Sequence, residues 1–103
     1  MILFFLQELD EMEQKMTSKI ITYDLCKQGR NYDELYAAIK ECNGWARVAE
    51  SVWFVKTNMS CKELRDKLLS KIDYNDRIFV AELTGVAAWH NTICDGNFLV
   101  NNL

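Results

Sequence analysis

Asp24 is the residue whose type and position most directly suggest chemistry. It lies near the end of an apolar run, 19–25 (Lys-Ile-Ile-Thr-Tyr-Asp-Leu), which alternates as a buried strand does. Magnesium prefers oxygen ligands and is often held by one or two carboxylates together with substrate phosphates. One Asp24 per subunit could therefore suffice to hold Mg²⁺, provided that a dimer axis brings two copies together. The alternative is a strand-end carboxylate that accepts hydrogen bonds from its own turn.

The loop after Asp24 contains two cations, Lys27 and Arg30, just before a helix that we expect to begin at Asn31. The free N–H groups of a helix N-terminus favour an anion. Lys27 and Arg30 are therefore candidate ligands for the phosphate of a nucleotide. The alternative is that this short basic loop is only a solvated turn.

Glu82 is a second carboxylate that could contribute to a metal site. The last strand should run antiparallel to the first, which places Asp24 near the start of the last strand and Glu82 near its other end. Four residues at about 3.3 Å each separate the two carboxylates by about 13 Å. Asp24 therefore has no acidic partner in its own subunit, and a catalytic site would have to be shared between chains.

Aromatic side chains offer a further means of binding nucleic acid, because bases stack on aromatic rings. The chain has three tryptophans, and packing in the core or at an interface is the simpler interpretation for all of them. The single histidine, His90, is more simply a surface or packing residue than a general base. The tryptophans are Trp45, Trp53 and Trp89.

The spacing of apolar residues predicts six elements in one domain. Strands are expected over 19–25, 45–49, 52–57 and 77–83, and helices over 31–42 and 60–72. Each helix begins with a capping-box pattern, and the two pairs are Asn31 with Glu34 and Ser60 with Glu63. The order is that of an α+β, ferredoxin-like fold (βαββαβ), an antiparallel sheet with two helices on one face. We expect the first and third strands to be central neighbours, parallel to each other.

Charge divides the chain into three parts. Residues 1–18 contain four acidic residues and one lysine, and their apolar residues recur at helical spacing, so they predict an acidic amphipathic helical extension. Residues 19–90 form the ferredoxin-like domain and are nearly neutral. Residues 91–103 are a C-terminal tail, either flexible or added as a strand to a neighbour. The apolar residues of the extension are Ile2, Leu3, Phe5, Leu6, Leu9, Met12 and Met16.

Composition excludes several classes of protein. The nearly neutral domain lacks the strongly basic character of a dedicated nucleic-acid binder. No apolar run approaches the roughly 18 residues of a membrane span, and the apolar start has no basic leader, so we expect a cytoplasmic protein that does not enter a membrane. The four cysteines have no Cys-x-x-Cys spacing, which favours buried, reduced thiols over a zinc site.

The sheet face without helices should be too apolar to remain in water. We expect it to carry Ile20 and Thr22 from the first strand and Ile78 and Val80 from the last. The third strand would add either Trp53 with Val55 or Val52 with Phe54. This face predicts pairing with a second copy, giving a homodimer or a higher homo-oligomer.

The chain resembles the small dimeric subunit of CRISPR adaptation complexes, and more closely the short bacterial and phage proteins often labelled SinR-like. The resemblance covers about residues 19–90 and rests on the order and spacing of several short motifs. It implies a ferredoxin-like fold, dimers paired through their sheets, and Asp24 as a magnesium ligand for phosphodiester cleavage. It also implies that some members bind nucleic acid without that chemistry. The motifs are Tyr23-Asp24, Asn31-Tyr-Asp-Glu-Leu35, Ser51-Val-Trp53, Asn75-Asp-Arg77 and Phe79-Val-Ala-Glu-Leu-Thr-Gly85.

These observations leave three functions open. The first is a dimer that binds nucleic acid or a nucleotide, with magnesium-dependent phosphodiesterase or nuclease activity through Asp24 as its catalytic form. The second is a non-catalytic oligomer that holds a small phosphorylated ligand or a protein partner, as phage counter-defence proteins do. The third is a protein–protein module that uses residues 1–16.

Overall fold

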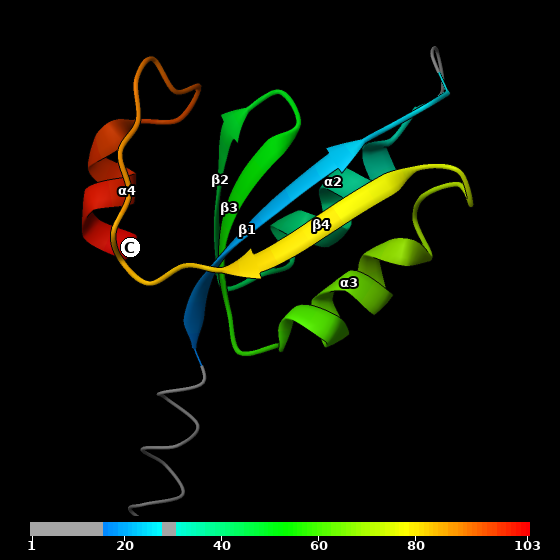
Figure 1. Cartoon of the computed structure of the whole chain (residues 1–103), viewed down its shortest axis with the longest axis horizontal. Helices are drawn as coiled ribbons and strands as arrows, with labels where there is room; N and C mark the ends of the chain where they lie inside the picture. The colour runs from blue at the N-terminus through cyan, green and yellow to red at the C-terminus, as the bar shows by residue number, and fades with distance from the viewer. Residues whose placement is uncertain (1–15, 28–30) are drawn as a thin grey trace, which may run out of the picture.

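The computed structural model describes residues 16–27 and 31–103. It contains four strands and three helices, and Figure 1 shows how they are arranged. The predicted N-terminal helix falls mostly on residues 1–15, which lie outside the described residues. In chain order the elements are β1 (Thr17–Asp24), α2 (Asp33–Lys40), β2 (Gly44–Ala49), β3 (Val52–Thr57), α3 (Cys61–Leu69), β4 (Arg77–Glu82) and α4 (Gly96–Asn102).

The four strands form one antiparallel sheet in the order β2-β3-β1-β4. The first and third strands are central neighbours, as expected, but they run antiparallel, so the prediction of a parallel pair was wrong. The reason is the connection between them. The crossover through α2 makes β2 parallel to β1, and the tight hairpin from β2 to β3 then reverses the chain once more. The α+β class and the antiparallel sheet are confirmed.

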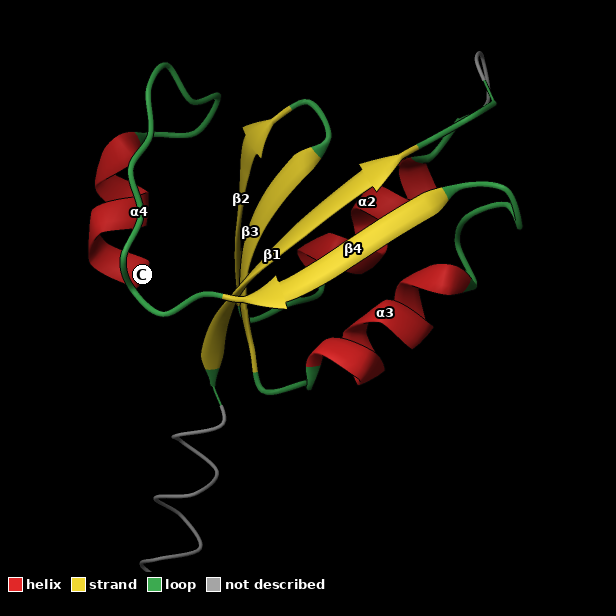
Figure 2. Cartoon of the chain, viewed as in Figure 1, coloured by secondary structure: helices red, strands yellow, loops and turns green. Residues whose placement is uncertain are grey.

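Helices α2 and α3 cover one face of the sheet and enclose the main core. In Figure 2 these two red helices lie on the opposite side of the yellow sheet from α4. Residues three and four apart share one helical face, and the apolar side chains on that face are buried in α2 and, at Leu64 and Leu68, in α3. From the sheet, Ile21 and Tyr23 face them together with Trp53 and Val55. The helical part of this core is Leu35, Ala38, Ile39, Cys42, Leu64 and Leu68.

The two predicted capping boxes have different outcomes. At α3 the box is present: Ser60 Oγ accepts the Glu63 N–H at 3.1 Å, and Glu63 accepts the Ser60 N–H at 3.1 Å. At α2 the N-cap is Tyr32, which makes no side-chain capping bond. Asn31 Oδ1 instead accepts the Asp33 N–H at 2.9 Å, a local turn in front of the helix.

The second face carries different residues from those expected on β4. Thr22 lies directly opposite Phe79, and Ile20 opposite Ala81, so Phe79 and Ala81 are on this face. Ile78 and Val80 point to the other face and pack against the main core, so their predicted placement was wrong. Side chains alternate along a strand, and a change of one residue in register therefore exchanges the faces.

The third strand settles the alternative that the sequence left open. Val52 is the partner of Thr22 and Phe54 that of Ile20, so the pair on the second face is Val52 and Phe54.

The C-terminal residues form α4, a helix rather than the expected tail or added strand. Leu99 is buried against Ala46 and Phe54, and the Phe98 ring meets Phe54 edge-on with ring centroids 5.9 Å apart. The backbone oxygen of Asn102 accepts hydrogen bonds from Ser18 and Lys56, at 3.0 and 2.7 Å. The part of the second face around Ala46 and Phe54 is therefore covered by the chain itself.

Within the described part of the chain, no helix has the length and apolar character needed to cross a bilayer. Of the four cysteines, only Cys42 is buried, and burial raises the pKa of its thiol. Cys26 is exposed, contrary to the prediction of buried thiols.

Candidate ligand site at the Asp24 end of the sheet

Asp24 is the last residue of β1 and lies directly opposite Arg77, the first residue of β4. Arg77 Nη1 donates to Asp24 Oδ2 at 3.0 Å, and the two side chains remain exposed, Arg77 at 75% and Asp24 at 69% of their full accessible area. The carboxylate therefore binds a cation across the strands. Together with Phe79, the pair borders a shallow hollow of about 200 Å³.

Glu82 lies at the other end of the same strand pair, opposite Lys19. Five positions of the register separate Asp24 from Lys19, which corresponds to about 16 Å. The two carboxylates thus occupy opposite ends of this strand pair, one residue further apart than the sequence predicted. Glu82 accepts a hydrogen bond from Thr17 Oγ1 at 2.9 Å and lies 3.5 Å from Lys19 Nζ. Those contacts, the Thr17 hydroxyl first, lower its pKa.

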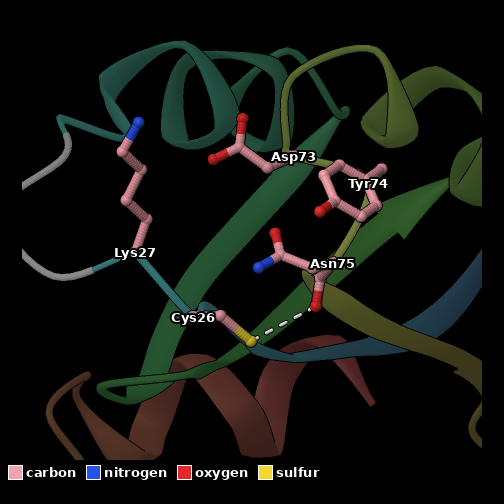
Figure 3. A pocket seen from close by; sticks show the side chains of 5 residues that line it. All are labelled: Cys26, Lys27, Asp73, Tyr74 and Asn75. Atoms are coloured by element: carbon pink, nitrogen blue, oxygen red, sulfur yellow. Dashed lines mark hydrogen bonds between the residues drawn. The ribbon is translucent and has the colours of Figure 1, made fainter.

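A larger hollow, of about 360 Å³, opens between the β1–α2 loop, which follows Asp24, and the α3–β4 turn, and Asp24 itself does not line it. The lining residues are drawn in Figure 3: Cys26 and Lys27 from the loop, and Asp73, Tyr74 and Asn75 from the turn. The charged ends of Lys27 and Asp73 lie on one side of it in that view. Lys27 is thus placed at a cavity, whereas Arg30 lies outside the described residues.

Asp76 holds the two sides of this hollow together. Its Oδ1 accepts the Cys26 N–H at 2.8 Å, and its Oδ2 accepts the Asp73 N–H at 2.8 Å. The Tyr32 hydroxyl lies 3.2 Å from Oδ2, in reach of a hydrogen bond. One carboxylate therefore connects the β1–α2 loop, the start of α2 and the α3–β4 turn.

Asp76 was missed by the sequence analysis as a residue of this site. The only local signal was its place in a polar turn, 73–76, which predicts a hydrogen-bonded turn and nothing more distant. Its contact with Cys26 spans fifty residues of sequence, and no local pattern encodes such a pairing.

The turn held by Asp76 presents polar and aromatic groups to solvent. Tyr74 is fully exposed, which is unusual for a large aromatic residue in a structured turn. The neighbouring Asn75 is exposed as well, and its backbone oxygen accepts a hydrogen bond from the Cys26 thiol at 3.2 Å. A cation, an aromatic ring and an amide thus surround one hollow.

Within one chain, the residues that the structure describes do not fit a magnesium site at Asp24. The carboxylate already pairs with a guanidinium, which repels a divalent cation. In the described ranges, no group of three or more histidine, cysteine, aspartate or glutamate side chains converges on one point. We therefore derive no metal-dependent step within one chain.

The three tryptophans have different environments. Trp53 is buried, and its Nε1 donates to the Tyr23 hydroxyl at 3.0 Å, so it belongs to the core. Burial raises the pKa of Tyr23, although the bond from Trp53 opposes that effect. Trp45 is exposed at the β2 edge, with Lys40 Nζ 5.0 Å from its ring centre. None of the three lies among the residues that line the hollow at the β1–α2 loop.

The chain was compared with protein-family models and with curated proteins, and it matches none of them. The geometry of this edge of the sheet is therefore the basis for a functional proposal.

Proposed function

We propose that the protein is a homodimer of the ferredoxin-like type that binds one nucleotide unit, free or within a nucleic-acid strand, in the hollow at the β1–α2 loop. The observation that carries this proposal is that the exposed Tyr74 ring and Lys27 line the same hollow of about 360 Å³ (Figure 3). Ligand pockets of small molecules are concave and have a few well-placed polar groups. The volume lies at the lower end of their usual range, roughly 300–1,000 Å³.

Each group around the hollow matches one part of a nucleotide. A base stacks on Tyr74, a type of contact that is worth about 1–3 kcal/mol per base. The Lys27 ammonium binds phosphate as a point charge, and Arg77 adds a second cation at the same edge. The Asn75 amide offers both donors and an acceptor for the edge of a base. Asp76 keeps these groups in place without contacting the ligand.

The fold assignment rests on the strand order β2-β3-β1-β4, with two helical crossovers on one face. This order, read with antiparallel neighbours, supports the ferredoxin-like arrangement. The resemblance of residues 19–90 to CRISPR adaptation subunits and SinR-like proteins supports it too, and it agrees with a nucleic-acid or nucleotide ligand.

Dimerisation uses the uncovered part of the second face, the Phe79 surface, which consists of Thr22, Val52, Phe79 and Ala81. Phe79 is 63% exposed there. The surface is continuous because Thr22 pairs with both Val52 and Phe79. It adjoins Asp24, so two copies that meet through it bring two ligand sites toward each other.

The test of dimerisation is light scattering after size exclusion at micromolar concentration. The wild-type chain should elute as a dimer and Phe79→Asp as a monomer. Val100→Asp on α4, which places the same charge on another exposed apolar residue, should remain dimeric. A monomeric wild-type chain would refute the dimer.

The test of ligand binding is fluorescence anisotropy with a short fluorescein-labelled oligothymidylate, and competition with ATP. We expect Tyr74→Ala to weaken binding about tenfold, since it removes one stacked base, and Tyr74→Phe to retain it. Lys27→Ala should weaken binding and reduce its dependence on salt. Ser70→Ala, in an exposed position outside the hollow, is the control. Wild-type affinity in both Tyr74→Ala and Lys27→Ala would rule out this site.

Binding without cleavage is the form that the geometry supports, because Asp24 is paired with Arg77 and joins no metal-binding cluster within the described residues. Magnesium-dependent cleavage would need a carboxylate from the second chain. One assay distinguishes binding alone from binding with cleavage: incubation of the labelled strand with and without magnesium. Cleavage by the wild type that disappears in Asp24→Ala would establish the catalytic form. Equal binding by wild type and Asp24→Asn, with no product from either, would establish the non-catalytic one.

A further inference from the structure

The second face of the sheet carries an apolar pocket that the proposed ligand site does not use. It lies between the strands and the C-terminal segment and has a volume of about 110 Å³. Its walls come from β1, β2, β3, α4 and the segment that follows β4. The residues that define it include Ile20, Phe54, Leu83, Ala88, Trp89 and Leu103.

The size and chemistry of this pocket specify what it can hold. An apolar cavity of roughly 150 Å³ stays dry and binds benzene. A pocket of about 110 Å³ with such walls therefore suits one aliphatic or aromatic side chain rather than a cofactor. An apolar group that fills it gains roughly 25 cal/mol for each Å² removed from water.

The pocket lies where residues 1–15 join the domain. Ser18, near the start of β1, accepts the Leu83 N–H at 2.8 Å and donates its hydroxyl to the Asn102 oxygen at 3.0 Å. Leu83 itself, and Leu103 next to Asn102, are walls of the pocket. The chain therefore enters β1 at the rim of the pocket, and a preceding segment reaches it without crossing the sheet.

We propose that residues 1–15 of the same chain dock over this pocket and that an apolar side chain from the middle of their stripe, Leu9, fills it. As a helix, fifteen residues span about 22 Å, which suffices to cover the pocket from Ser18. Leu9 lies at the centre of the apolar stripe. Of the four acidic residues, Glu8, Asp10 and Glu11 lie about 100° or more from it around a helix, and Glu13 lies one turn along on the same side. The segment thus covers apolar surface on the second face beside α4.

The test is hydrogen–deuterium exchange of the amides of residues 1–15 in the full chain. Wild-type amides should exchange more slowly than those of an unstructured chain. Leu9→Asp should raise their exchange rates about tenfold or more, because it would place a charge in the apolar pocket. Gln14→Asp, with the same added charge about 140° from Leu9 around the helix, should leave the rates within about twofold of wild type.

A second pair of variants tests the pocket from the domain side. Ala88 is an exposed residue that lines the pocket, so Ala88→Trp should fill the pocket and raise the exchange rates of residues 1–15 as Leu9→Asp does. Val86→Trp makes a comparable change at an exposed residue that does not line the pocket, and it should have no effect.

Three results would overturn the proposal. One is exchange of the wild-type amides at the rate of an unstructured chain. Another is protection that both Leu9→Asp and Ala88→Trp leave unchanged. The third is protection that disappears on dilution together with a fall in mass by light scattering, because the occupant of the pocket is then the segment of a second copy.

Discussion

Strands β1 and β4 are joined by two cross-strand ion pairs, one at each end, and the two differ in burial. Asp24 pairs with Arg77 where both side chains are open to water, whereas Lys19 pairs with Glu82 from a side chain that is only 2% exposed. The Lys19 ammonium also donates to the Thr17 hydroxyl. The lysine of one pair is thus buried, although its partner Glu82 is 58% exposed, whereas both side chains of the other pair lie at the surface.

The difference explains why the ligand site is proposed at the Asp24 end. A buried ammonium must keep its partners, because an unpaired buried charge is costly. An exposed pair is worth only about 0–1 kcal/mol, so either member can exchange its partner for a ligand at little cost to the fold. The ion pair at the Lys19 end therefore stabilises the fold, whereas the side chains at the Asp24 end are available to bind a ligand.

The largest effect is expected from Lys19→Ala. The substitution removes a buried aliphatic stem together with the ammonium, and it should lower the free energy of unfolding by about 2–4 kcal/mol. Urea unfolding followed by circular dichroism measures the change.

Two variants control this experiment. Lys19→Met keeps an apolar stem of similar length and should recover most of the loss. Arg77→Ala, the matched change at the other end, should cost less than about 1 kcal/mol. The comparison fails if Lys19→Ala is no more destabilising than Arg77→Ala.

A smaller loss is expected from Asp76→Ala, which removes the carboxylate that joins the two sides of the hollow. Buried or half-buried donors that lose an acceptor cost about 1–3 kcal/mol. The half-buried N–H of Asp73 would lose its acceptor, whereas the exposed N–H of Cys26 would bond to water instead. The free energy of unfolding should therefore fall by about that amount. The affinity for the oligothymidylate should fall as well, because Tyr74 is no longer held in place.

Asp76→Asn keeps one acceptor oxygen. Its free energy of unfolding and its affinity for the oligothymidylate should therefore both lie between those of wild type and Asp76→Ala. Wild-type affinity in Asp76→Ala would show that the turn does not need this residue for its shape.

A third, weaker effect concerns the exposed pair itself. In a double-mutant cycle of Asp24→Ala and Arg77→Ala, the coupling energy should be about 0.2–1 kcal/mol and should decrease in high salt. A coupling of about 2 kcal/mol or more, on the order of that for buried hydrogen-bonded charges, would mean that the Asp24 end is as structural as the Lys19 end.

Local patterns predicted the elements of the fold but not how their faces combine. The apolar stripes of α2 and α3 and the Ser60–Glu63 box depend on residues three and four apart, and these were right. The faces of β4 were exchanged because 77–83 is apolar at most positions, so alternation alone does not tell Phe79 from Ile78. Only the pairing of Thr22 with Phe79 decides it, and that pairing depends on the whole sheet.

The site shows the same division between local and distant information. Asp24 and Lys27 were found because a strand end and a basic loop are visible in the sequence. Arg77 pairs with Asp24, and Asp76 holds the loop that contains Lys27, although both lie about fifty residues further along the chain. Their roles follow from the sheet register and from a turn that folds back on the β1–α2 loop. The C-terminal helix was missed because residues 98–100 form a short apolar run without helical repeats.

The smallest effect is a dependence of stability on pH at the Lys19 end. Hydrogen bonding from Thr17, and then the charge of Lys19, lower the pKa of Glu82 in the folded chain. A carboxylate whose folded pKa is depressed stabilises the fold above its unfolded pKa, about 4.3. That stabilisation is lost as the pH falls through the folded pKa. Wild type should thus be more stable than Glu82→Gln at neutral pH, and the difference should vanish in acid.

Urea midpoints measured from neutral pH into strong acid follow this difference, and Thr17→Val identifies its source. Since the Thr17 hydroxyl is the main cause of the lowered pKa, the stability difference between the parent chain and Glu82→Gln should shrink when both carry Thr17→Val. A difference that persists unchanged below the folded pKa would mean that glutamine disturbs packing rather than charge. In that case the Lys19 end would owe its stability to the lysine stem alone.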